Sequence, residues 1–275
     1  MPPDRAAPIP FGVKSVSMTR RHLLAATGAA FAAASAQDSP KSAFFELRRY
    51  LMRNSRTNMT RRTTEFVTKA YVPAARRAGI GPIGLFNASI APDSPFLLVL
   101  SGYPALGAMQ TSLEKLAADT DYQKALDEFS AVPDLAFIRM ESTLFRCFPS
   151  MPAIETGPPA EGRGSRVFEL RVYESDNEGT LRRKIKMFGD GEIAIFRRSG
   201  IQPVFFGEAL VGPRLPQLTY MAAYDSMAGR DKAWQAFGAD PEWQKLRSLP
   251  GYSDAEIVSN ISNAILRPAA GSDIR

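Results

Sequence analysis

The chain has 275 residues, of which 45% are hydrophobic and 23% are charged, a composition typical of a globular protein and not of a disordered one. Its net charge of +6 suggests a polyanionic partner, but residues 1–36 hold four basic residues and one acid, so the remainder carries only +3. The remaining basic residues are scattered among acids and form no stripe interleaved with aromatics, which argues against nucleic-acid binding.

An export signal is predicted over residues 1–36. Arg20-Arg21-His22-Leu23-Leu24 precedes a short apolar run of small residues, and Ala34-Ser35-Ala36 offers an A-x-A cleavage site. The adjacent arginines resemble a twin-arginine leader. We therefore expect cleavage after Ala36 and a periplasmic or extracellular protein, although an Ala-rich helix of the fold is the alternative. Because the Pro-rich stretch before Met18 fits no signal region, Met18 competes with Met1 as the start.

No later segment reaches the length of about 20 apolar residues that a membrane-spanning helix needs, so permanent membrane insertion is not expected. The rest of the chain contains an internal repeat. Phe45–Tyr50 (FELRRY) recurs as Phe168–Tyr173 (FELRVY), and Arg77–Ile80 (RAGI) recurs 121 positions later as RSGI. The predicted organisation is a first α+β domain (37–150), a Pro/Gly-rich linker (151–165) and a second α+β domain (166–275).

Each copy is predicted to form the same elements in the order β-α-β-β-α-β, the ferredoxin-like split arrangement. The expected strands and helices are 44–52, 61–78, 84–89, 96–103, 106–126 and 137–148, and then 167–174, 180–199, 203–210, 218–224, 227–246 and 256–266. Pro73 is expected to kink the first helix. Asp240 and Pro241 predict a helix restart, with Asp240 as its N-cap.

The second copy contains Pro213–Tyr220 (PRLPQLTY), Arg230–Trp234 (RDKAW) and Asp240–Trp243 (DPEW), and it ends in Leu266-Arg267-Pro268. With these motifs the sequence resembles the NIPSNAP family, which is similar in fold to the dimeric α+β barrel superfamily. The motifs are degraded in the first copy, where Met109, Leu113 and Tyr122 stand in place of Arg230, Trp234 and Trp243.

The resemblance implies an α+β fold of two tandem ferredoxin-like units whose antiparallel sheets face each other as a barrel. Physical reasoning leads to the same expectation, because a four-stranded sheet with helices on one side leaves its other face open to water. With both units in one chain, the barrel closes either within a monomer or between the chains of a homo-oligomer.

The two-residue period of strands separates the opening strand of each copy into an apolar and a polar face. We expect the apolar residues, such as Phe45 and Phe168, to pack beneath the helices. The polar residues are then expected to point into the barrel and form a candidate pocket, with Tyr220 from a third strand: Glu46, Arg48, Tyr50, Glu169, Arg171, Tyr173 and Tyr220. Such a pocket offers a guanidinium for an anionic or carbonyl group beside Glu and Tyr for proton transfer. The alternative is a self-satisfied Glu–Arg network.

Arg230 and Trp234 are four residues apart on the predicted second helix and share a face. Arg230 is a candidate anion anchor near the barrel rim. In the alternative interpretation, Arg230 is a cap or stacking partner and the two tryptophans are packing residues.

The only histidine is His22, inside the predicted leader, which excludes a Ser-His-Asp triad, histidine-ligated haem and imidazole-dependent metal sites in the mature chain. Cys147 is expected to be a small core residue. Acidic pairs such as Asp119/Asp121 and Asp190/Glu192 are expected at the solvated surface, with a site for a hard cation as the alternative. We therefore expect neither a metal nor a cofactor.

Two main classes of function remain. In the first class, the protein binds a small organic ligand in the barrel or binds a protein partner. In the second class, it is a cofactor-free enzyme, similar to a monooxygenase or an isomerase, that uses Glu, Tyr and Arg. A structural role without any ligand is a third alternative. Fold alone does not decide among them.

Overall fold

The computed structural model describes residues 43–157 and 166–275, all within one compact unit. The predicted export signal and the end of the predicted linker lie outside the described residues. The first half of the chain forms β1 (Phe44–Leu51), α1 (Met59–Phe66), a π-helical turn (Val67–Tyr71), α2 (Val72–Arg77), β2 (Ile83–Ile90), β3 (Phe96–Tyr103), α3 (Leu106–Ala118), α4 (Thr120–Ser130) and β4 (Arg139–Cys147).

The second half repeats this order with one additional short helix. It forms β5 (Val167–Glu174), α5 (Glu178–Met187), a second π-helical turn (Phe188–Glu192), α6 (Ile193–Arg198), β6 (Gln202–Val211), β7 (Gln217–Tyr224), α7 (Met227–Ala239), α8 (Pro241–Arg247), α9 (Asp254–Ile257) and β8 (Asn260–Pro268).

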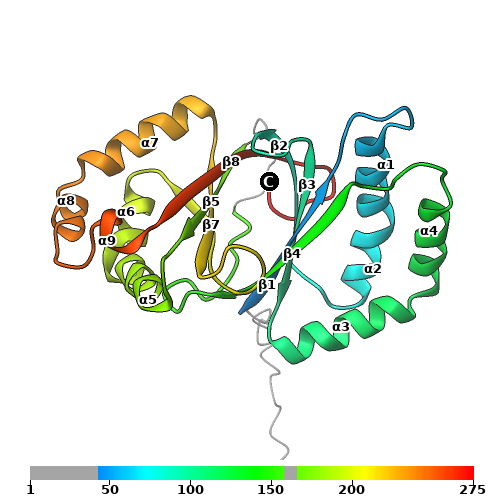
Figure 1. Cartoon of the computed structure of the whole chain (residues 1–275), viewed down its shortest axis with the longest axis horizontal. Helices are drawn as coiled ribbons and strands as arrows, with labels where there is room; N and C mark the ends of the chain where they lie inside the picture. The colour runs from blue at the N-terminus through cyan, green and yellow to red at the C-terminus, as the bar shows by residue number, and fades with distance from the viewer. Residues whose placement is uncertain (1–42, 158–165) are drawn as a thin grey trace, which may run out of the picture. The chain divides into compact units, whose positions relative to one another are not determined.

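The strands form a closed antiparallel barrel in the order β1-β3-β2-β8-β5-β7-β6-β4. Each half supplies four neighbouring strands, and the halves join where β2 pairs with β8 and β4 pairs with β6. Figure 1 shows α1–α4 beside one side of this barrel and α5–α9 beside the other. The predicted fold class is confirmed, and the barrel closes within one chain.

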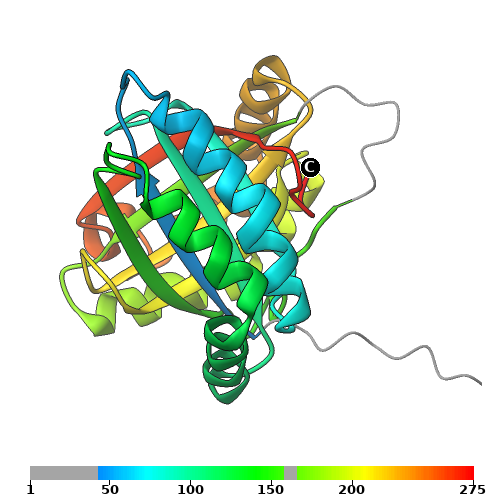
Figure 2. The ribbon, with the colours of Figure 1, turned by 90° about the vertical axis from the view of Figure 1, so that its right-hand side faces the viewer.

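Three apolar clusters hold the fold together. The first fills the barrel with residues from both halves, among them Phe45 of β1, Phe145 of β4 and Phe205 of β6. The other two lie between the strands and the helices, one in each half. Figure 2 shows the helices of the first half packed across the outer face of its strands. Each sheet is therefore buried on both faces.

Several element boundaries differ from the prediction. The predicted helix 106–126 is two helices, because Asp119 ends α3 and caps α4. The restart at Asp240 is confirmed, since its side chain accepts hydrogen bonds from the backbone N–H groups of Glu242 and Trp243. The last strand was predicted over 256–266 but begins at Asn260, and residues 254–257 form α9, whose Ser253 and Glu256 make a capping box.

Instead of a kink at Pro73, the helix contains a π-helical turn just before this residue. The residues on either side of the turn have ordinary helical backbone angles. The second copy has the same turn at the equivalent position without a proline, so Pro73 is not its cause. In the described part of the chain, no helix combines the length and the apolar character that crossing a membrane requires.

Candidate functional site

The prediction of two faces on each opening strand is right, but the assignment of those faces to the inside and outside of the barrel is wrong. Phe45 and Phe168 belong to the cluster that fills the barrel. Tyr50 and Tyr173 belong to the clusters beneath the helices, and Glu46 and Glu169 lie on the same face as they do. The interior of an eight-stranded barrel is just wide enough for side chains to fill it, and here aromatic rings do so.

Glu169 of β5 is the centre of a polar cluster between the sheet and α7. Its fully buried carboxylate accepts hydrogen bonds from Arg171 (2.9 Å), from Nε and Nη2 of Arg230 (2.8 and 2.7 Å) and from Nε1 of Trp234 (3.0 Å). Asn263 of β8 adds a donor at 3.3 Å. Burial alone would raise the pKa of Glu169, but these donors and charges outweigh burial and lower the pKa. Glu169 is therefore ionised and a weaker proton acceptor than an ordinary glutamate.

Arg230 was predicted to be an anion anchor near the barrel rim. The structure places it on α7, where its guanidinium binds Glu169 and also contacts Asp231 at 3.0 Å. The anion that it holds thus belongs to the protein itself. The predicted sharing of a helix face by Arg230 and Trp234 is confirmed, because both donate to the same carboxylate.

The first copy keeps a smaller version of this cluster. Arg48 donates to both oxygens of Glu46 at 3.1 Å, and Ser142 donates at 2.6 Å. Met109 and Leu113, which stand where the second copy has Arg230 and Trp234, supply no donors of that kind. In the first copy, helix α3 therefore donates no hydrogen bonds of this kind to the buried glutamate.

The predicted tyrosines lie with these clusters and away from the barrel interior. The Tyr173 hydroxyl is 3.1 Å from that of Tyr220 and accepts a hydrogen bond from Arg171 at 3.2 Å. Tyr220 is fully buried, and burial raises its pKa well above the ordinary value, which keeps it protonated. Tyr50 packs edge-on against Phe137.

An additional buried ion pair lies beneath α5, where Glu192 was expected at the solvated surface. Lys184 is 3.2 Å from Glu192 and 3.3 Å from Asp254, and only 1% of its side chain is exposed. Burial raises the pKa of Glu192 to about 6, because the attraction of Lys184 offsets only part of the desolvation. For Lys184, the attraction of Glu192 and Asp254 outweighs burial and raises the pKa, so the amine stays charged.

This pair predicts a specific pH dependence of stability. Since the pKa of Glu192 is higher in the folded state than its ordinary 4.5, protonation favours the folded state. The resulting stabilisation is complete below pH 4.5 and is lost as the pH rises through about 6. Relative to Glu192→Gln, the wild type should lose about 2 kcal/mol of unfolding free energy across this window. Urea titrations of both proteins at several pH values test this, and parallel profiles would contradict it.

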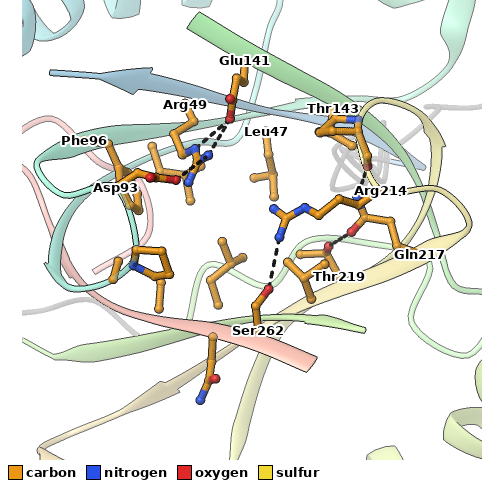
Figure 3. Close-up of a pocket in the computed structure, with 18 of the residues that line it drawn as sticks. Leu47, Arg49, Asp93, Phe96, Glu141, Thr143, Arg214, Gln217, Thr219 and Ser262 are labelled. Atoms are coloured by element: carbon orange, nitrogen blue, oxygen red, sulfur yellow. Dashed lines mark hydrogen bonds and ion pairs between the residues drawn. The ribbon is translucent and has the colours of Figure 1, made fainter. Parts of the chain in front are cut away.

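A cavity of about 330 Å³ lies at one end of the barrel. Its walls come from both halves and are apolar in depth, with Leu47, Leu98, Phe145, Leu170 and Ala264. Polar side chains line its mouth, namely Arg49, Asp93, Glu141, Thr143, Arg214 and Ser262, and the buried Gln217 and Thr219 also line the cavity. Figure 3 shows them around the opening. An apolar interior with a few convergent polar groups is the usual form of a small-molecule site.

The charged groups at the mouth are unequally paired. Nε and Nη2 of Arg49 donate to one oxygen of Glu141 at 3.0 and 2.6 Å, and Asp93 is 3.6 Å from the same guanidinium. Among the described residues, Arg214 makes one hydrogen bond, to Ser262 at 3.3 Å (Figure 3). It also lies 3.9 Å from Glu174. The positive charge of Arg214 is therefore the less compensated of the two.

None of the mouth residues was predicted from the sequence. One signal was present at Arg49, which is a charged residue on the otherwise apolar face that carries Phe45 and Leu47. A second signal is that Ile90–Pro95 (IAPDSP) and Val211–Pro216 (VGPRLP) are equivalent hairpins at the offset of the repeat. Both hairpins contribute residues to the cavity.

Cys147 lies buried on β4, and burial raises its thiol pKa to about 12, so it is protonated and unreactive at neutral pH. Within residues 43–157 and 166–275, no group of three or more His, Cys, Asp or Glu side chains is arranged to hold a metal ion.

Solved structures of other proteins have a similar fold. The NIPSNAP family model matches residues 168–273, which is less than half of the chain. No curated protein matches the sequence. A candidate monooxygenase from Fusobacterium nucleatum is similar in structure, with a TM-score of 0.53 and 8% identity over 82% of this chain and 91% of that one. An anthrone oxidase-like protein has a TM-score of 0.50 and 14% identity over 84% and 93%. A NIPSNAP-like protein from Burkholderia xenovorans is 23% identical over 38% of this chain and 86% of its own, with a TM-score of 0.35.

Proposed function

We propose that this protein binds a small organic molecule in the mouth of its barrel. The observation that carries the proposal is the cavity of about 330 Å³, which has an apolar interior, a polar rim and walls from both halves of the chain. Its size suits a ligand of roughly ten non-hydrogen atoms, if each occupies about the volume of a water molecule in the liquid. Burial of the ligand's apolar part against Leu47, Leu98 and Leu170 would supply the main attraction.

The enzymatic alternative receives less support from the site. The groups expected to transfer protons, Glu46, Glu169, Tyr50 and Tyr173, lie beneath the helices, and none of them lines the cavity. The structural relatives with oxygenase names are at most 14% identical to this chain, so the likeness extends to fold only. A binding protein needs nothing beyond the cavity itself.

Filling the cavity tests the proposal. The full chain is purified, and native mass spectrometry identifies any co-purifying small molecule in the wild type and in Leu170→Trp. The added ring should occupy the space of the ligand and lower its occupancy at least tenfold. Leu113→Trp, at a partly exposed position of α3 far from the cavity lining, is the matched control and should retain the ligand.

Two results would contradict the proposal. One is a bound molecule that survives in Leu170→Trp as fully as in Leu113→Trp. The other is a wild-type protein that carries no molecule and binds none of the probes described below. Consumption of a bound molecule during incubation in air would instead favour the enzymatic alternative.

A further inference from the structure

The two hairpins at the cavity mouth are equivalent by the repeat but carry opposite charges. Asp93 in the β2–β3 hairpin corresponds to Arg214 in the β6–β7 hairpin, and both have left-handed backbone angles, with φ of 57° and 61°. Asp tolerates this conformation, whereas a long side chain such as Arg adopts it rarely. The backbone of Arg214 is thus held in an unusual conformation beside the cavity that its side chain lines.

The surroundings of the two side chains differ in electrostatic terms. Asp93 and Glu141 both face Arg49, and Arg139 also contacts Glu141 at 3.0 Å, so the cations on this side already have carboxylate partners. An anion approaching there meets no uncompensated positive charge. On the other side, Arg214 contacts one neutral hydroxyl, and the Glu174 carboxylate at 3.9 Å lies outside the cavity lining and beyond hydrogen-bond distance.

Arg214 also has unused hydrogen-bonding capacity. A guanidinium has five N–H donors, and in the described residues Arg214 uses one of them, on Ser262. Figure 3 shows the guanidinium reaching over the cavity. Its side chain is 45% exposed, so it can reorient toward a ligand at little cost. A planar guanidinium matches a carboxylate with two parallel hydrogen bonds.

We propose that the ligand is an amphipathic carboxylate, with its apolar part in the barrel and its carboxylate on Arg214. This inference rests on the proposed function and adds the chemical class and orientation of the ligand. The apolar part lies among Leu98, Leu170 and Ala264, and the head remains at the mouth. The other side of the mouth offers the head no available guanidinium, because Asp93 and Glu141 already hold Arg49 and Arg139.

Three eight-carbon probes of equal chain length test the class: octanoate, 1-octanol and octylammonium. Isothermal titration calorimetry at neutral pH measures the binding of each to the full chain. Octanoate should bind at least about tenfold more tightly than octanol, and octylammonium should bind most weakly. In Arg214→Gln the preference for octanoate over octanol should disappear, because the affinity for octanoate falls to that for octanol. Arg214→Lys should keep part of the preference, because lysine retains the positive charge but lacks the two parallel N–H donors of a guanidinium.

Arg197→Gln is the matched control, since Arg197 is 46% exposed, pairs with Glu155 and does not line the cavity. It should leave the binding of all three probes unchanged. Equal binding of octanoate and octanol to the wild type, or a preference that persists in Arg214→Gln, would overturn the carboxylate proposal and leave the barrel site standing. If no probe binds to the wild type and Leu170→Trp does not lower the amount of any co-purified molecule, the barrel site itself is refuted.

Discussion

Replacing Glu169 by alanine should lower the free energy of unfolding by about 3–5 kcal/mol, the usual loss when one partner of a buried ion pair is removed. The variant leaves the Arg171 and Arg230 guanidinium groups without their common acceptor, and it removes the acceptor of the Trp234 indole N–H. Chemical denaturation of the wild type and the variant at neutral pH measures the difference.

The internal repeat supplies the control. Glu46 occupies the equivalent position on β1 but accepts only from Arg48 and Ser142. Glu46→Ala should therefore cost less, about 1.5–3 kcal/mol, the range for hydrogen bonds to a charged group. Equal losses in the two variants would show that the donors on α7 contribute nothing, and would refute the view that the second-copy motif is a stabilising network.

Replacing Phe45 by alanine should also be severe, with a loss of about 3–5 kcal/mol for a fully buried ring. Phe45 of β1 stacks on Phe145 of β4, with ring centroids 4.9 Å apart, and packs against Phe205 of β6 at 4.5 Å. The change leaves a void next to a seam between the halves. Phe129→Ala removes a ring on α4 that is stacked but only half-buried, and it should cost less.

Gly207 of β6 allows a sharper test of the same contact. A Cβ atom at Gly207 would overlap the Phe45 ring, so Gly207→Val should be destabilising by about 1–3 kcal/mol in the wild type. In Phe45→Ala the valine enters the vacated space. The double variant should be more stable than the sum of the single losses predicts, by about 1–3 kcal/mol in a double-mutant cycle. Simple additivity would mean that the ring and the glycine do not share this space.

The repeat and the alternation of the strands were enough to predict two α+β units and the division of each opening strand into two faces, whereas the barrel was implied by the family resemblance. They were not enough to decide which face lies inside, because a barrel of this type buries both faces of its sheet. The deciding information was in the helix. Arg230 and Trp234, four residues apart, supply donors that Glu169 finds only in the layer beneath α7. Phenylalanine requires no such partner and can fill the barrel.

The cavity could not be predicted from the strands, because the polar residues at its mouth come from segments that are distant in the sequence. Arg214 of the β6–β7 hairpin contacts Ser262 of β8, and Asp93 of the β2–β3 hairpin faces Arg49 of β1. Both contacts lie within one half of the chain and depend on the registers of β5 with β8 and of β1 with β3. The alternation of polar and apolar residues along one strand does not determine those registers.

The closure of the barrel within a single chain has a consequence for recognition. In a symmetric homodimer of such units, the twofold axis would place the same side chain on both hairpins, so the opening would be electrically identical on its two sides. Here the equivalent positions are Asp93 and Arg214. Two copies within one chain can carry different side chains at equivalent positions, and here only the Arg214 side offers a weakly compensated cation. Such an opening presents different groups to the two ends of a ligand, so its two orientations would not be equivalent.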